Sequence, residues 1–345
     1  MKILFIAPKV FNLHKPMIEE LQRQGNEVDF IGDVMFTHDN GFKSKSKIKK
    51  LTDYILHNND KTEKKYWKAL FEQKDIYKKR YDLCLCVNAY CIGNYFIDNI
   101  KRMNPGIRLV LYLWDSLHFF DFKRNFKYFD KVYTFDYEDC LNNAEAKFLP
   151  LYWLPIKSSE EVIYDVSLIG SHHDDRLKIA EEIAHQLDEH NLNYYFKIVC
   201  TCNAKWSPTL IKAYIKAKII GNKSSMRDIK IMVGEESHPL ISRNFYSIED
   251  TNRIISQSKC VLDTDRPSQS GLTSRFMWAI GQGKKIITTN SSIKKMPFYD
   301  ENSILVVDRN SPVIDIDFIK KENKREPHPF LMKSRLDNFI RELIS

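Results

Sequence analysis

The stretch from Gln269 to Arg275, QSGLTSR, combines small residues, hydroxyl groups and an arginine. It joins an apolar run expected to be a strand, residues 259–263, to a helix expected over residues 271–282. The first backbone N–H groups of a helix lack intrahelical partners and the helix dipole is positive there, which suits a phosphate. The candidate phosphate contacts are Gln269, Ser270, Gly271, Thr273 and Arg275.

A second loop with similar chemistry runs from Gly170 to Arg176, GSHHDDR, between an expected strand, 164–169, and an expected helix, 177–189. The guanidinium group of arginine donates charge-assisted hydrogen bonds in a fork that matches phosphate. The two loops together are expected to hold a diphosphate, and no metal ion is invoked. The alternative for both loops is plain helix capping, and His173 suits either role.

Two further expected strands, residues 108–113 and 131–135, lead into carboxylates, Asp115 and Asp136. Ligands of doubly wound sheets sit beyond the carboxyl ends of the strands, so these side chains are expected to line a site. Asp115 is the first candidate for a general base, His14 the second and Asp136 the third. The alternative for Asp115 is a helix cap or a salt bridge, and for His14 a surface histidine before a helix.

The chain of 345 residues, of which 28% are charged and 43% hydrophobic, predicts a globular protein with two domains. The apolar run in the opening MKILFIAPKV is too short for a signal peptide. No apolar run elsewhere approaches the roughly 20 residues of a membrane span. A cytoplasmic location is therefore expected. The seven cysteines lack the spacing of metal ligands and are expected to be buried free thiols.

The net charge of +8 is concentrated in the first third of the chain, at residues 43–50 and 61–80. Such a patch could bind nucleic acid or the anionic surface of a membrane, and the alternative is a solvated helix surface. No signature of a nucleic-acid-binding module is present, so nucleic acid is not an expected partner.

Strand and helix patterns alternate twice, once on each side of the proline-containing, polar stretch 150–161. Two doubly wound domains are predicted, each with a parallel sheet between helices. The first loop lacks the G-x-G-x-x-G of a dinucleotide site, so no such cofactor is expected. The predicted parts are a first domain at 1–155 with a basic helical elaboration at 36–80, a second domain at 156–328, and a C-terminal helix within 329–345 that could cross back to the first domain.

Several short runs also follow one another in a distinctive order. They are YLWDS from Tyr112, FD from Phe135, DC from Asp139, DVSLIG from Asp165, DR from Asp175, QSGLTSR from Gln269, GKKIITTN from Gly283 and FY from Phe298. Over about residues 80–310 the sequence thereby resembles a family of bacterial surface-polysaccharide glycosyltransferases, associated with lipopolysaccharide and capsule biosynthesis. The resemblance implies the α/β fold called GT-B, in which two Rossmann-like doubly wound domains face each other across a cleft.

The resemblance also implies a nucleotide-sugar donor in the second domain and a glycan or lipid-linked glycan acceptor in the first. The expected activity is metal-independent transfer of a sugar to lipopolysaccharide, O-antigen or capsule, with no cofactor besides the nucleotide-sugar substrate. Asp115, or else His14, would deprotonate the acceptor. The basic segment could hold this cytoplasmic enzyme peripherally on the inner face of the plasma membrane.

The chain departs from that family at Trp278, where many relatives carry a glutamate that could bind a ribose hydroxyl. Trp278 can equally be a core residue. The departure leaves two rivals open. One is a GT-B transferase that uses a CMP-activated acidic sugar or a polyol phosphate, and the other is a catalytically inactive nucleotide-sugar-binding partner. The donor sugar, the linkage and the stereochemical course do not follow from the sequence.

Overall fold

The structure, a computed structural model, describes residues 1–33, 60–156, 161–200, 206–267, 270–322 and 328–345. Their contacts divide the chain into two compact units. The first unit comprises Met1–Pro155, Ser268–Met277 and His328–Ser345, and the second comprises Ile156–Pro267 and Trp278–Pro327. The segment Ser268–Met277, which we expected in the second domain, is thus grouped with the first, and the border falls inside helix α10 (Ser274–Gly281).

The first unit is built on a six-stranded sheet in the order β2-β1-β3-β4-β5-β6 with all neighbours parallel. Its strands are apolar on both faces because helices cover both sides of such a sheet. Strand order reverses between β1 and β3, which is the switch point of a doubly wound sheet. The strands are β1 (Lys2–Pro8), β2 (Glu27–Asp33), β3 (Leu83–Val87), β4 (Arg108–Leu113), β5 (Lys131–Thr134) and β6 (Ala146–Phe148).

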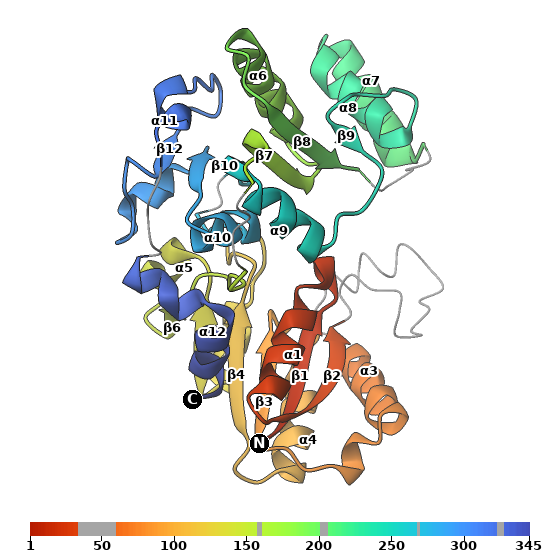
Figure 1. The fold of residues 1–345 in the computed structure, drawn as a ribbon. Helices are drawn as coiled ribbons and strands as arrows, with labels where there is room; N and C mark the ends of the chain where they lie inside the picture. The colour runs from red at the N-terminus through yellow and green to blue at the C-terminus, as the bar shows by residue number, and fades with distance from the viewer. Residues whose placement is uncertain (34–59, 157–160, 201–205, 268–269, 323–327) are drawn as a thin grey trace. The chain divides into compact units, whose positions relative to one another are not determined.

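The helices of the first unit cover both faces of its sheet (Figure 1). On one face Trp67 and Phe71 of α3 pack with Phe96 of α4 and the inward side chains of β1, β3 and β4. The other face carries α1 and α12, which pack against each other. The helices are α1 (His14–Arg23), α3 (Asp60–Gln73), α4 (Asn94–Met103), α5 (Tyr137–Asn142) and α12 (Leu336–Ile344).

The C-terminal helix α12 is an integral part of the first unit. Phe339 is fully buried, and its ring lies 5.0 Å from that of Tyr112 and 5.6 Å from that of Tyr152. Arg108 also donates a hydrogen bond of 2.8 Å to the carbonyl oxygen of Ile344. The chain therefore returns to its first domain at the C-terminus.

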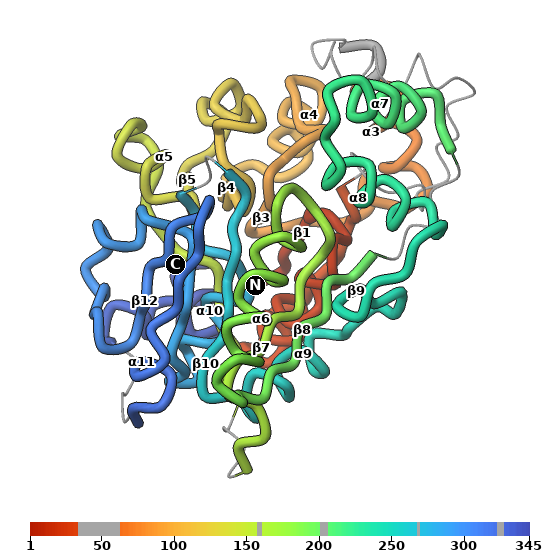
Figure 2. The backbone as a smooth tube through the Cα atoms, turned by 90° about the horizontal axis from the view of Figure 1, so that it is seen from above, coloured from red at the N-terminus to blue at the C-terminus, as the bar shows by residue number. Residues whose placement is uncertain are grey.

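The second unit contains a six-stranded parallel sheet in the order β12-β11-β10-β7-β8-β9 (Figure 2). Here the switch point lies between β7 and β10, and the strand β9 was not expected from the sequence. The strands are β7 (Tyr164–Ser171), β8 (Tyr194–Val199), β9 (Ile241–Ser242), β10 (Ser258–Asp263), β11 (Lys285–Thr288) and β12 (Ile304–Val306). Two doubly wound parallel sheets confirm the predicted α/β architecture.

Local sequence signals start several helices of the second unit. Ser207 caps α7 by accepting a hydrogen bond from the backbone N–H of Leu210, and Ser247 with Asp250 forms a capping box before α9. The helices are α6 (Arg176–Glu189), α7 (Pro208–Ile219), α8 (Lys223–Val233), α9 (Ile248–Ser256), α10 and α11 (Ile316–Lys320). Short 3₁₀ helices in the two units are Val10–Asn12, Ile76–Lys78, Lys123–Tyr128, Ser291–Lys295 and Pro329–Ser334.

Two absences apply to the part of the chain that the structure describes. No helix there combines the length and apolar character that a membrane span requires. No disulfide joins the six described cysteines, while Cys202 and the lysine-rich residues 43–50 lie outside the described residues.

We predict that Phe339→Ala destabilises the protein by about 3–5 kcal/mol, because a large buried ring leaves a cavity between α12 and β4. The free energy of unfolding is measured by chemical denaturation of the full chain. Leu141→Ala is the control in the same unit, since that side chain is 63% exposed, and it should change the free energy by less than about 0.5 kcal/mol. Equal stability of both variants would contradict the packing of α12.

Candidate functional site

At the carboxyl edge of the first sheet, beyond β3 and β4, a hydrogen-bond network holds the carboxylate of Asp115. Its Oδ2 accepts hydrogen bonds from the hydroxyl of Tyr90 at 2.6 Å and from Nδ2 of Asn88 at 2.7 Å. Oδ1 of Asn88 in turn accepts from the backbone N–H of Trp114 at 2.9 Å. The loops after β3 and β4 therefore orient this carboxylate together, and Asp115 is half-buried at the carboxyl edge.

The loop after β3 owes its shape to unusual backbone conformations. Asn88 and Ala89 have φ values of 60° and 57°, a left-handed region that side chains with a Cβ rarely occupy. The next residue, Tyr90, donates its backbone N–H to Oδ2 of Asp33, a buried carboxylate at the end of β2, over 2.8 Å. Such conformations persist where surrounding contacts impose them, and here they place the Tyr90 hydroxyl on Asp115.

A second carboxylate, Asp139, lies near the same edge. Its Oδ2 accepts a hydrogen bond from the backbone N–H of Leu117 at 2.7 Å. Burial raises the pKa of Asp139 to about 6, with the nearby charge of Asp136 acting in the same direction. Sequence reasoning matched Asp139 to a motif without giving it a role, because burial and neighbouring charge are not visible in a sequence.

His14 is not the surface histidine that the alternative reading described. Its side chain begins α1, is buried, and stacks on the ring of Phe30 with 4.8 Å between centroids. Burial lowers the pKa of His14 to about 4, and the positive charges of Lys9 and Lys15 contribute to that shift. His14 is therefore neutral at pH 7, as a base must be, while its burial also fits a packing role.

Asp136 is fully buried and acts as a hydrogen-bond acceptor for two parts of the chain. Its Oδ1 caps α5 by accepting from the backbone N–H groups of Glu138 and Asp139. The hydroxyl of Ser270 donates to Oδ1, and the N–H of Gly271 donates to Oδ2 over 3.1 Å. Two of the candidate phosphate contacts are thus engaged with this carboxylate in the first unit.

The segment that contains Ser270 and Gly271 passes so close to Phe135 that position 271 must be glycine. A Cβ on Gly271 would lie 2.4 Å from the ring of Phe135, closer than any side chain tolerates. Thr273 precedes α10, and its Oγ1 accepts from the N–H of Phe276 at 3.1 Å. Arg275 lies in the first turn of α10 and is 6% exposed, while Gln269 lies outside the described residues.

In the second unit, Arg176 ties the two sides of the switch point together. Its Nε donates to Oγ1 of Thr264 over 2.6 Å, and a terminal nitrogen donates to the carbonyl oxygen of Ser171 over 2.6 Å. The other terminal nitrogen donates to the carbonyl oxygen of Thr264. The buried guanidinium thereby fixes the loops after β7 and β10, and a direct contact between Arg176 and a phosphate stays a prediction.

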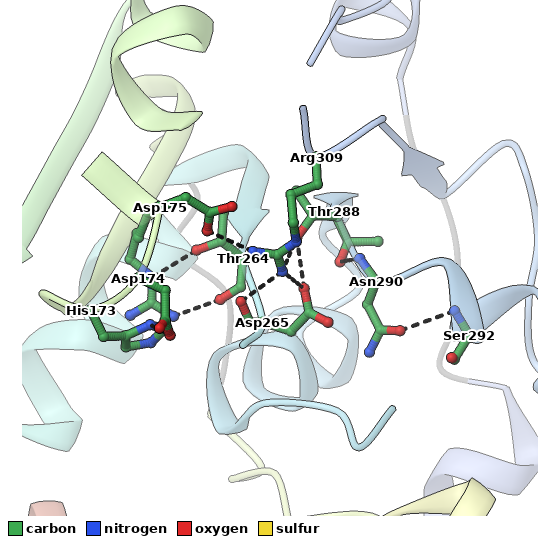
Figure 3. Close-up of polar contacts among 11 residues, drawn as sticks. His173, Asp174, Asp175, Thr264, Asp265, Thr288, Asn290, Ser292 and Arg309 are labelled. Atoms are coloured by element: carbon green, nitrogen blue, oxygen red, sulfur yellow. Dashed lines mark hydrogen bonds and ion pairs between the residues drawn. The ribbon is translucent and has the colours of Figure 1, made fainter. Parts of the chain in front are cut away.

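Gly170 and His173 both lie at the carboxyl end of β7 in the second sheet. Gly170 is the penultimate residue of β7, and His173 follows in the loop before α6. The ring nitrogen Nδ1 of His173 lies 2.9 Å from Oδ2 of Asp174 (Figure 3). That pairing orients the ring at the N-terminal end of α6, which has 14 residues and a positive dipole end there.

Arg309, which sequence reasoning missed, lies at the centre of the polar contacts drawn in Figure 3. It donates to Oδ1 of Asp175 at 2.6 Å, and to the carbonyl oxygen of Asp265 at 2.8 Å. Its ion pair with the Asp265 carboxylate is 2.5 Å long, and Thr289 donates to the same Oδ1. Arg309 follows β12, so it is far from its partners in sequence and only the sheet brings the three loops together.

The run Asp263-Thr264-Asp265 has the D-x-D spacing of a metal motif, which sequence reasoning overlooked. Within the described ranges, no group of three or more histidine, cysteine or acidic residues is arranged to hold a metal ion. The Asp265 carboxylate is instead compensated by Arg309, although burial still raises its pKa. The ion pair of Asp265 and Arg309 therefore links the loops after β10 and β12.

The candidate residues form two groups. Asp115, His14, Ser270, Gly271, Thr273 and Arg275 belong to the first unit, and Gly170, His173 and Arg176 belong to the second. The two arginines expected to hold one diphosphate therefore lie in different units. Trp278, which belongs to the second unit, is 6% exposed, as a core residue is.

We predict that Asp136→Ala lowers the free energy of unfolding by on the order of 2–4 kcal/mol. The change removes a helix cap, worth about 1 kcal/mol, and leaves the buried donors of Ser270 and Gly271 without an acceptor, at about 1–3 kcal/mol. Chemical denaturation measures the effect. Asp98→Ala on the exposed face of α4 is the control and should be near neutral; an equally small effect at position 136 would refute the role of its carboxylate.

Comparisons with known proteins concern the fold alone. No family model matches the sequence, and no curated protein matches it. Among solved structures, Anabaena Alr3699/HepE in complex with UDP and glucose is similar with a TM-score of 0.50 and 11% identity, over 99% of this chain and 95% of that one. A UDP-N-acetylglucosamine 2-epimerase homologue from Listeria monocytogenes gives a TM-score of 0.49 and 10% identity, over 99% and 94% of the two chains. The fold of this chain is of the GT-B type.

Proposed function

We propose that this protein is a GT-B glycosyltransferase that transfers a sugar from a nucleotide-sugar donor to a bacterial cell-surface glycan. The second unit binds the donor, and the first unit activates a hydroxyl group of the acceptor. The acceptor is a lipopolysaccharide, O-antigen or capsule glycan, lipid-linked in the growing state. The enzyme needs neither a metal ion nor a further cofactor, and it works peripherally on the inner face of the plasma membrane.

The observation that carries the proposal is the presence of two doubly wound parallel sheets, one in each unit. The similarity to Alr3699/HepE covers 99% of this chain, and that protein was solved with UDP and glucose bound. Ligands in doubly wound sheets sit beyond the carboxyl ends of the strands, and in this chain polar networks join loops at that edge of both sheets. The resemblance of the sequence motifs supports the choice of a surface glycan as acceptor.

Glycosyl transfer has two electrostatic requirements. A base takes the proton of the acceptor hydroxyl while its oxygen forms a bond to the anomeric carbon, and the leaving diphosphate must be stabilised as its bond to that carbon breaks. We assign the first task to Asp115, whose carboxylate is oriented by Tyr90 and Asn88. In the second unit we assign the second task to the N-terminus of α6 with His173, while Arg176 and Arg309 keep the loops in position.

A panel of donors tests the proposal. The protein is incubated with UDP-, GDP-, dTDP- and CMP-sugars while thermal shift and donor hydrolysis are followed. Stabilisation and turnover with a nucleoside diphosphate sugar are expected. Stabilisation by CMP-sugars alone would favour the acidic-sugar or polyol-phosphate transferase, and binding without turnover on any glycan acceptor would favour an inactive partner.

We predict that Asp115→Asn leaves donor affinity unchanged and lowers the transfer rate by about 10²- to 10⁴-fold, because an amide cannot accept the acceptor proton. Donor affinity comes from titration calorimetry and the rate from a transfer assay with the donor found in the panel. Asp121→Asn, an exposed carboxylate on the loop after β4, is the control. Full activity of the Asp115 variant would exclude this residue as the base.

Tyr90→Phe tests the positioning of Asp115. The Tyr90 hydroxyl donates to Oδ2, and a donor to a carboxylate favours its ionised form. Removing it should raise the pKa of Asp115, so the acid limb of the pH–rate profile moves to higher pH by up to about one unit, with KM for the donor unchanged. The buried carboxylate of Asp33, which accepts from the backbone N–H of Tyr90, stays in place.

Tyr128→Phe is the matched control, because that hydroxyl bonds Asn94 on the surface. An acid limb that stays in place in Tyr90→Phe, with activity retained, would show that the hydroxyl does not act on the base.

A further inference from the structure

Helix α7 of the second unit exposes apolar side chains to an extent that needs an explanation. Ile211, Ile215 and Ile219 are 43%, 49% and 79% exposed, and Ile220 directly after the helix is 64% exposed. Trp206, just before it, is 37% exposed. Within the helix only Ala217 is buried. Contiguous exposed apolar groups of this kind mark interaction sites.

The exposed isoleucines form one stripe along the helix. Ile211, Ile215 and Ile219 are spaced by four residues, and such residues lie above one another on a helix face. Helix α7 packs against α8, and its less exposed residues, Leu210, Tyr214 and Ala217, are separate from this stripe. Figure 1 shows α7 beside α8, on the side of the second sheet that ends in β9. The stripe therefore lies on a different face of α7 from its less exposed residues.

Lysines border the stripe on both sides. At 100° per residue, Lys212 and Lys216 follow one border of the stripe and Lys218 lies along the other. All three are exposed, and α7 contains no acidic residue. Just before the helix, Glu235 accepts a hydrogen bond of 2.5 Å from Nε1 of Trp206.

The charge of this face decides between possible occupants. A second copy of the chain would bring the same lysines against one another, since a two-fold interface places a patch on itself. The lysine-rich residues 43–50 of the chain would be repelled in the same way. An anionic phospholipid surface matches both features, because isoleucines enter the acyl boundary while lysines extend along them to the headgroups.

We propose that the Ile211–Ile215–Ile219 stripe of α7 with its lysine borders is a docking surface for an anionic phospholipid membrane. A helix of 12 residues with three isoleucines is a shallow interfacial contact, so binding is reversible and sensitive to salt. Trp206 at the start of the helix suits the interface, where aromatic rings with a polar end accumulate. The proposed surface consists of residues of α7 and does not include the basic segment 43–80 that the sequence suggested.

This inference deepens the membrane contact in the proposed function, yet its test needs no donor, acceptor or turnover. The intact protein is co-sedimented with vesicles of phosphatidylcholine alone and with vesicles that contain phosphatidylglycerol. Binding to the anionic vesicles is expected, with a decrease as salt concentration rises. Donor binding is followed in parallel, so that its failure would count against the proposed function and leave the vesicle result intact.

Two double variants address the two features of the surface. Ile215→Asp with Ile219→Asp and, separately, Lys212→Glu with Lys216→Glu should each reduce partition onto anionic vesicles by about tenfold or more. Thermal stability should stay unchanged, because these side chains are exposed. Val313→Asp is the matched control, since that apolar side chain lies in the same unit, between β12 and α11, and is 70% exposed; this variant should bind as the unaltered protein does.

Several outcomes would overturn the proposal. Unchanged vesicle binding by both double variants would place the contact elsewhere on the chain. A large drop in melting temperature of the aspartate variant would show that the chain itself covers the stripe. A dimer in light scattering that dissociates in the aspartate variant would assign the stripe to a second copy. A stable monomer that binds no vesicle would favour an acidic protein as partner.

Discussion

The buried carboxylate of Asp136 is the contact on which the arrangement of the first unit depends. Taking a carboxylate out of water is costly unless hydrogen bonds compensate its charge, and this one accepts from both the α5 N-terminus and the segment of Ser270 and Gly271. The two partners lie 134 and 135 residues away in sequence. The beginning of α10 is therefore positioned by the end of β5, and the close contact of Gly271 with Phe135 leaves no room for a side chain.

The two sheets hold the loops at their carboxyl edges by opposite chemistry. In the first unit a carboxylate, Asp115, is oriented by the neutral donors Tyr90 and Asn88. In the second unit the guanidinium groups of Arg176 and Arg309 are surrounded by carbonyl, hydroxyl and carboxylate acceptors. An oriented carboxylate suits the removal of a proton from a hydroxyl group. The two arginines hold their loops in position, and under the proposed function the N-terminus of α6 meets the anionic donor.

The contacts described at the two sheet edges involve no residue of α7. The exposure of its isoleucines therefore calls for a different explanation. Their exposure forgoes the stabilisation that burial of each side chain would bring, about 1.5–3 kcal/mol when complete. A partner that covers them recovers part of that free energy. An enzyme whose acceptor is attached to lipid would gain from such a contact, because both reactants would then meet at one surface.

Sequence alone determined the alternation of strands and helices. The apolar runs of β4 and β8 and the capping box of α9 are local signals, and the structure follows them closely. Tertiary structure decided the partners of each polar side chain. Arg309 joins Asp175 and Asp265, His14 lies under Phe30, and the segment of Ser270 groups with the first unit. These contacts depend on strand order and burial, which a local pattern does not encode.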